Sequence, residues 1–298
     1  MTAKEPPGRS PSPLLSPLLS PLAPGAAAGA CLGIADVVSK LVLTAGSDVI
    51  SLLLFRSAIG LLFLTAWLGY GARPQADARV RWISMIVGLL FAALIFCLYQ
   101  AITVIDVPTA VLVYFTYPLL TGLAAAAIGL ERLRWRGALC AVAAFAGLAI
   151  MIGAHPAGLL YAGVALGIGA AGFRTVMFLV MRICLVGADA RITTWYTMLA
   201  TTALFAVAAL AMQTWRPPQT EVGWIALAIV SLSSTAANLF IFISTMRIGP
   251  FRTALIMHLE PLTALVLSAI LLGEVITPLQ GIGSAVMLAA LIAFQLWR

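Results

Sequence analysis

Hydrophobic residues in this chain gather in ten long runs that are separated by short polar turns. A helix needs about 20 apolar residues to cross a lipid bilayer, and each run is close to that length or longer. Glycine and proline mark several of the breaks, as at Gly46 and at Gly249-Pro250. The pattern predicts an all-α membrane protein with ten transmembrane helices, at approximately 25–44, 48–70, 82–104, 108–130, 134–153, 158–182, 192–212, 222–246, 250–273 and 277–297.

One long stretch of the chain occurs twice. Residues 108–131 read PTAVLVYFTYPLLTGLAAAAIGLE, and 143 positions later residues 251–274 read FRTALIMHLEPLTALVLSAILLGE. Each copy carries a proline near its middle, and each ends with an acidic residue, Glu131 or Glu274. The return of these features at one spacing indicates a duplicated membrane protein.

The duplication divides the chain into two halves, 25–153 and 158–298, with five predicted spans each. The first and sixth spans share Leu-Gly-Ile at a shift of 134 positions, which aligns Lys40 with Arg174 and gives the first half longer connections. Because five is an odd number, the second half must enter the membrane from the opposite face. The expected fold is therefore two inverted five-helix repeats, which is typical of transporters with a substrate site near the membrane midplane.

Basic residues lie almost entirely on one side of the predicted membrane. Thirteen Lys and Arg side chains fall in the segments on the same side as the N-terminus, and only Arg216 falls on the other side. This asymmetry predicts cytoplasmic N- and C-termini. The net charge of +7 comes from these turns, so we expect no nucleic-acid partner. Only 9% of residues are charged, against about 25% in soluble domains, so the lipid bilayer is the expected environment.

The N-terminal residues 1–24 differ from the rest of the chain. They contain a Ser-Pro-Leu repeat whose closely spaced prolines are incompatible with a helix, which predicts a disordered cytoplasmic tail or an over-long start. The cysteines lie inside apolar runs without the spacing of metal ligands, and we expect no metal and no cofactor. They are Cys31, Cys97, Cys140 and Cys184.

The arrangement of these motifs resembles the EamA family of the drug/metabolite transporter superfamily. The similar features are the two five-span halves, Phe-Arg-Ser at Phe55–Ser57, Leu-Glu-Pro at Leu259–Pro261 and Leu-Gly-Glu at Leu272–Glu274. The resemblance covers about residues 25–298. It implies a secondary transporter of the bacterial inner membrane, rather than an enzyme, that exports a small metabolite by alternating access. Amino acids or related compounds are the implied substrates, with the aromatic amino acid exporters as a model branch.

Two ionisable residues lie four positions apart in the first span. Asp36 and Lys40 share one helix face, where opposite charges can pair. Intramembrane charges are costly and are usually functional, so Asp36 is a candidate site for a substrate ammonium or a coupling proton, with Lys40 as a carboxylate partner. A structural ion pair, or a Lys40 side chain that extends toward the interface, explains the same pattern.

The repeated prolines point to a second group of candidates. Tyr117 and Glu260 are equivalent in the two copies, and each directly precedes a proline within a span. Proline leaves the carbonyl four residues earlier without its usual donor, here at Tyr114 and Met257. Such groups are tolerated in a membrane beside protein or water, so both sites are expected to face a central cavity. The alternative is that the prolines only kink packed helices.

Other polar side chains within the spans complete the candidate set. Arg174 could act at a gate or extend toward the interface, and Arg56 is expected to pair with Asp36 or Asp48. His258 is expected to be a hydrogen-bonded structural residue. Tyrosines provide apolar walls with one polar group each, and Asn238 is the best cavity candidate in the unusually polar eighth span. The predicted substrate-binding residues are Asp36, Lys40, Tyr99, Tyr114, Tyr117, Arg174, Asn238 and Glu260.

The chain contains no Walker loop, no HExxH and no paired-acid motif for diphosphate chemistry. An intramembrane enzyme remains an alternative, because catalytic partners need only meet in space. A channel is a further alternative, although inverted halves favour alternating access over a fixed pore. The expected partners are a small-molecule substrate, the bilayer and a coupling proton.

Overall fold

The computed structural model describes residues 21–70, 76–153 and 161–296, and the regular structure within these ranges is helical. Ten segments are long and apolar enough to span a membrane, as the hydrophobic runs predict. Most of the proposed N-terminal tail, residues 1–20, lies outside the described residues. The helices are α1 (Ala23–Thr44), α2 (Val49–Gly69), α3 (Ala78–Val104), α4 (Val107–Tyr114), α5 (Tyr117–Ala127), α6 (Trp135–Ile152), α7 (Tyr161–Cys184), α8 (Ala190–Ala211), α9 (Glu221–Ile248), α10 (Pro250–Ile256), α11 (Leu259–Leu272) and α12 (Pro278–Leu296).

Two of the spans are broken in the middle. The fourth span consists of α4 and α5, and the ninth consists of α10 and α11. Each break directly precedes the proline of the repeat, Pro118 or Pro261, which cannot donate a backbone hydrogen bond. The carbonyl of Met257 was predicted to lack a donor, but the amide of Glu260 donates a hydrogen bond to it at 3.0 Å. The chain thus tightens into a short turn that satisfies this group and starts a new half-helix.

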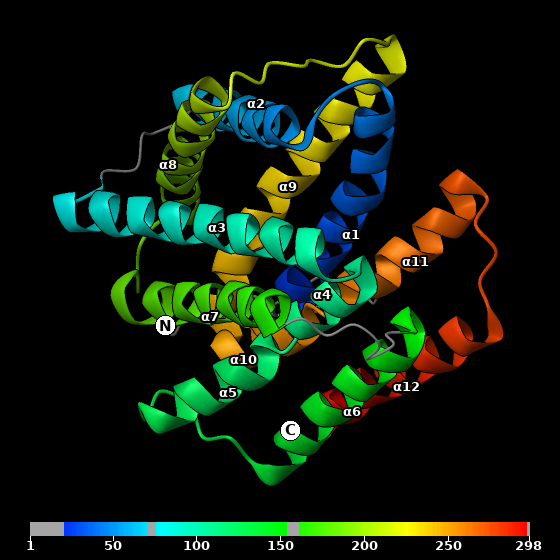
Figure 1. Cartoon of the computed structure of the whole chain (residues 1–298). Helices are drawn as coiled ribbons and strands as arrows, with labels where there is room; N and C mark the ends of the chain where they lie inside the picture. The colour runs from blue at the N-terminus through cyan, green and yellow to red at the C-terminus, as the bar shows by residue number, and fades with distance from the viewer. Residues whose placement is uncertain (1–20, 71–75, 154–160, 297–298) are drawn as a thin grey trace, which may run out of the picture.

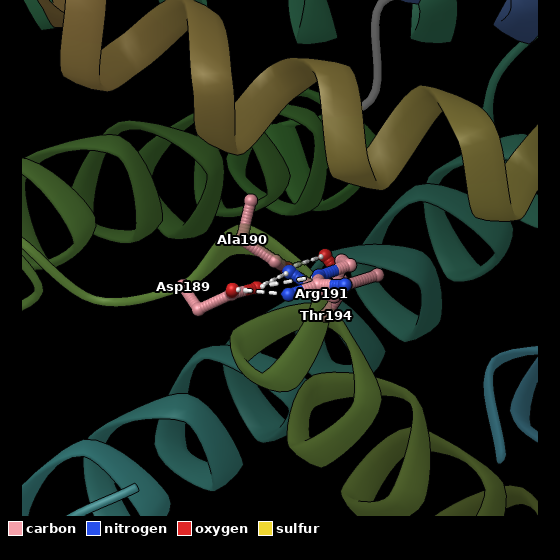
Figure 2. Close-up of polar contacts among 4 residues, drawn as sticks. All are labelled: Asp189, Ala190, Arg191 and Thr194. Atoms are coloured by element: carbon pink, nitrogen blue, oxygen red, sulfur yellow. Dashed lines mark hydrogen bonds and ion pairs between the residues drawn. The ribbon is translucent and has the colours of Figure 1, made fainter. Parts of the chain in front are cut away.

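Aspartates cap the second helix of each half. The Asp48 carboxylate accepts hydrogen bonds from the amide and the hydroxyl of Ser51 at the start of α2. At the start of α8, the Asp189 carboxylate accepts from the amide and guanidinium of Arg191 (Figure 2). The hydrogen bond from the Arg191 side chain lowers the pKa of Asp189, so this cap is charged at neutral pH. Both caps satisfy amides that a helix start leaves without partners.

The helices of the two halves interlock as a symmetric pair. The most extensive contacts join α1 to α9 and α3 to α7. Because α1 is equivalent to α7 and α3 is equivalent to α9, these two contacts are equivalent to each other. The helices α6 and α12, which are equivalent, lie side by side at one edge of the bundle (Figure 1). Their backbones meet at Gly147 and Gly283, where an added Cβ would lie within 3 Å of the opposite backbone. These contacts confirm the inverted five-helix repeats.

The alignment of the first span with the sixth was wrong. A Cβ added to Gly25 would lie 3.3 Å from Ile256, and one added to Gly167 would lie 2.7 Å from Val113. Since Val113 and Ile256 are equivalent at the shift of 143, Gly25 and Gly167 are equivalent at a shift of 142. Lys40 therefore corresponds to Arg182, not to Arg174. Three shared apolar letters are a weak signal in helices made largely of Ala, Gly, Leu and Ile, whereas packing against a partner helix is specific.

Candidate functional site

The two helix breaks place polar side chains at the centre of the bundle. Glu260 lies at the start of α11, next to α1, where an added Cβ on Gly33 would lie 2.6 Å from the Glu260 carbonyl oxygen. This close approach brings Glu260 beside Asp36 of α1, and their carboxyl groups are near enough to share a hydrogen bond. The start of a half-helix carries a partial positive charge, which suits a carboxylate at this position.

Two arginines lie on either side of this carboxyl pair. Arg56 of α2 interacts electrostatically with Asp36, and Arg174 of α7 interacts with Glu260. Arg56 lies near enough to Asp36 to interact with its charge, but the two form no ion pair within 4 Å in the described part of the chain, and its other proposed partner, Asp48, caps a helix. Arg56 was not among the predicted substrate-binding residues. Its position inside a span was the signal that could have placed it there.

Arg174 is an unusual side chain, because it is deeply buried and incompletely hydrogen-bonded. Only 2% of its surface is exposed, so it does not extend toward the interface. Its guanidinium carbon lies 5.7 Å from the centre of the Tyr117 ring and 5.2 Å from that of Phe178. Its Nε and Nη2 atoms, and the Tyr117 hydroxyl, have no hydrogen-bond partner among the described residues. Buried polar groups are normally paired, and here the Arg174 guanidinium and the Tyr117 hydroxyl interact without meeting the geometry of a hydrogen bond.

Tyrosines surround the charged groups. Tyr114 and Tyr117 are buried, and their ring centres lie 5.2 Å apart across the break between α4 and α5. Both interact with Arg174 and Glu260, whereas Tyr99 of α3 interacts with Arg56 and Asp36. We call the seven residues of this group the central cluster. They are Asp36, Arg56, Tyr99, Tyr114, Tyr117, Arg174 and Glu260.

Comparisons with known proteins agree with this architecture. The model of the EamA-like transporter family matches residues 22–153 and 161–295, one match for each half. This chain belongs to the EamA-like transporter family. It is a multi-pass membrane transporter. A solved structure described as "Crystal structure of protein" shares the fold, with 19% identity, a TM-score of 0.75, and coverage of 91% of this chain and 99% of the other. No curated protein matches the chain.

Two predicted site residues of this EamA-like transporter lie outside the central cluster. Lys40 does not pair with Asp36, because its Nζ atom binds the Glu274 carboxylate at 3.1 Å. Asn238 donates a hydrogen bond to the Ser234 carbonyl at 2.9 Å. It lines a small cavity that Arg56 also lines, together with polar side chains of α8 such as Thr201. Asn238 therefore shares a cavity with one member of the cluster, and the local spacing of Asp36 and Lys40 was misleading.

His258 makes one hydrogen bond, as the sequence predicted, while its Nε2 atom has no partner among the described residues. It is buried, its Nδ1 lies 3.0 Å from the Leu255 carbonyl oxygen, and its ring packs against that of Phe115. Within the described ranges, His, Cys, Asp and Glu side chains form no group of three or more that could hold a metal ion.

The repeat places a second pair of charges at the other end of the transporter. Lys40 corresponds to Arg182, and its partner Glu274 corresponds to Glu131. Burial raises the pKa of Glu131 to about 7, against the opposing charges of Arg252 and Arg182 and a hydrogen bond from the Phe251 amide. Within the described part of the chain, Glu131 and Arg182 form no ion pair within 4 Å, whereas Lys40 and Glu274 do. Equivalent charge pairs thus differ between the two ends.

Proposed function

We propose that this transporter exports a small zwitterionic metabolite, an amino acid or a related compound, across the bacterial inner membrane by alternating access. In this proposal the N- and C-termini lie in the cytoplasm. The observation that carries the proposal is the central cluster, in which the Asp36–Glu260 carboxyl pair lies near the buried, incompletely hydrogen-bonded Arg174.

The chemistry of the cluster matches both ends of an amino acid. Two carboxyl groups in contact repel each other unless a proton or another cation lies between them, so an α-ammonium group or a coupling proton is the natural ligand of Asp36 and Glu260. A guanidinium binds a carboxylate through two parallel hydrogen bonds, and Arg174 has two nitrogen atoms without partners. The rings of Tyr114 and Tyr117 would pack against the substrate side chain, which is consistent with an aromatic amino acid.

Alternating access is supported by the charge pairs at the two ends. Each pair joins the two halves of the transporter, since Lys40 and Glu131 belong to the first repeat and Glu274 and Arg182 to the second. One pair is formed and the other is not, which is the asymmetry that a carrier needs in any single state. Movement of the halves would form one pair as it breaks the other, around a central site that stays in place.

The direct test is transport by the purified protein in proteoliposomes. A resistance screen on overexpressing cells, challenged with toxic amino acid analogues, would first narrow the choice of substrate. Saturable uptake of a labelled amino acid and acceleration by unlabelled amino acid on the other side would establish a carrier. Flux that neither saturates nor shows counterflow would indicate a channel, and a new chemical product in sealed vesicles would indicate an enzyme.

A further inference from the structure

A large pocket opens at the end of the bundle where α5 ends and α6 begins. Its volume is about 670 Å³, and it lies among the α5–α6 connection, the end of α7, the α9–α10 junction and α12. None of the central-cluster residues lines it. It is therefore distinct from the central cluster, although Glu131 and Arg182 of the end charge pair line it, and in the proposed orientation it lies at the cytoplasmic face. We call it the arginine pocket.

The arginine pocket carries far more positive than negative charge. Six of its lining side chains are arginines, and its only acidic lining residue among those the structure describes is Glu131. No acidic side chain in the described ranges forms an ion pair with any of these arginines. Like charges held together without compensation repel, so a bound anion would stabilise the pocket. The arginines are Arg132, Arg134, Arg136, Arg182, Arg247 and Arg252.

Both halves of the transporter contribute to this charge. Arg134 and Arg136 come from the first repeat at the start of α6, whereas Arg247 and Arg252 come from the second repeat at the α9–α10 junction. Arg182 is held toward this junction, because its guanidinium donates a hydrogen bond to the Met246 carbonyl. Several guanidinium groups that line one pocket can together bind a phosphate group, because its oxygens accept several hydrogen bonds.

We propose that the arginine pocket binds a phosphate group, either the headgroup of an anionic phospholipid or free phosphate. The pocket lies at the ends of spans, where headgroups are expected in the proposed orientation, and Cys140 and Phe294 give it apolar lining for the glycerol or acyl portion of a lipid. Bound phosphate would bridge the two halves at this end. The zwitterionic substrate proposed for the central cluster is a poor ligand here, since the pocket offers one acid against six cations.

The matched variants are Arg134→Gln/Arg136→Gln in the pocket and Arg79→Gln/Arg81→Gln outside it. Both remove two arginines, two positions apart, from the start of a transmembrane helix on the same side of the protein. Lipid binding is measured by native mass spectrometry, as phosphatidylglycerol retained by protein taken from mixed phosphatidylcholine and phosphatidylglycerol nanodiscs. Binding of inorganic phosphate is measured by thermal unfolding in phosphatidylcholine nanodiscs.

The wild-type protein and Arg79→Gln/Arg81→Gln should bind one of the two probes equally well, and Arg134→Gln/Arg136→Gln should bind it about 30-fold more weakly. Retained phosphatidylglycerol would identify the lipid, and stabilisation by inorganic phosphate would identify the free anion. Arg252→Gln, from the other half, should weaken binding about fivefold, and it serves if the double variant does not fold. Equal loss in both double variants, or no binding of either probe, would overturn the proposal. Because no transport is measured, this result is independent of the transport assay.

Discussion

Replacement of Arg174 by methionine should separate stability from substrate binding. Its two contacts with aromatic rings contribute about 0.5–2 kcal/mol each. Keeping a charge this deeply buried costs several kcal/mol, and two of its three guanidinium nitrogens gain no hydrogen bond in return. Methionine keeps the length and packing of the apolar stem. Glu260, which loses the nearby positive charge, can take up a proton instead. The free energy of unfolding of Arg174→Met should therefore stay within about 2 kcal/mol of the wild type, or increase.

Substrate binding should respond in the opposite way. Each hydrogen bond between a guanidinium and a carboxylate contributes about 1.5–3 kcal/mol, so the loss of two should weaken affinity at least about 100-fold. Arg174→Lys keeps the charge but not the bidentate geometry, so its affinity for the substrate should lie between those of the wild type and Arg174→Met. The assays are thermal unfolding and binding of the labelled substrate, with Arg79→Met as the surface control. A strongly destabilised Arg174→Met protein whose folded fraction binds substrate normally would refute the reasoning and make Arg174 a structural residue.

Three further predictions concern the ends of the bundle. Lys40→Glu should break an ion pair whose side chains are 56% and 54% exposed, and such a pair contributes at most about 1 kcal/mol. Hydrogen exchange at the end of α1 should therefore accelerate up to about fivefold. The double variant Lys40→Glu/Glu274→Lys should restore slow exchange, and exchange as fast as in the single variant would contradict the prediction. The raised pKa of Glu131 favours its neutral form in the folded protein, so its contribution to stability is complete below pH 4.5 and is lost as the pH rises through about 7. Wild-type thermal stability should therefore fall between pH 5 and 7 more than that of Glu131→Gln, and identical slopes would exclude this role. Reporter fusions should be extracytoplasmic after Gln213 and cytoplasmic after Gly187, because of the asymmetry in basic residues; the reverse pattern would invert the proposed orientation.

Span positions and the inverted repeat could be predicted because both follow from local features of the sequence. Membrane crossing requires about 20 apolar residues, and the turns between runs are marked by charge, Gly and Pro. The recurrence of Pro118 at Pro261 located the two helix breaks correctly. The offset of the first span was mispredicted, because Leu-Gly-Ile is too common in apolar helices to identify an equivalent position. The packing of Gly25 and Gly167 against their partner helices carries that information instead.

The candidate site was predicted less completely. Ionisable residues deep in spans were identified from the high free energy of placing a charge in a membrane. Of these, Asp36, Glu260 and Arg174 do lie together with the tyrosines. Partners were harder to predict, because helix spacing shows which side chains share a face but not which helix lies opposite. Lys40 thus binds Glu274 from another helix rather than its neighbour Asp36. Asn238 lines a small cavity together with Arg56 of the cluster.

The central claim is that Asp36 and Glu260 bind the cation that the transporter carries or exchanges. The most direct measurement is counterflow of the labelled substrate against pH, in proteoliposomes that hold equal amounts of wild type, Glu260→Gln and Asp36→Asn. Both amides keep the shape of the acid and can hydrogen-bond, so both variants should fold. Glu260→Gln should lose transport or its dependence on pH, and Asp36→Asn should show a similar or smaller change. Wild-type rates with an unchanged pH profile in both variants would contradict the account and leave the two acids as helix-packing groups.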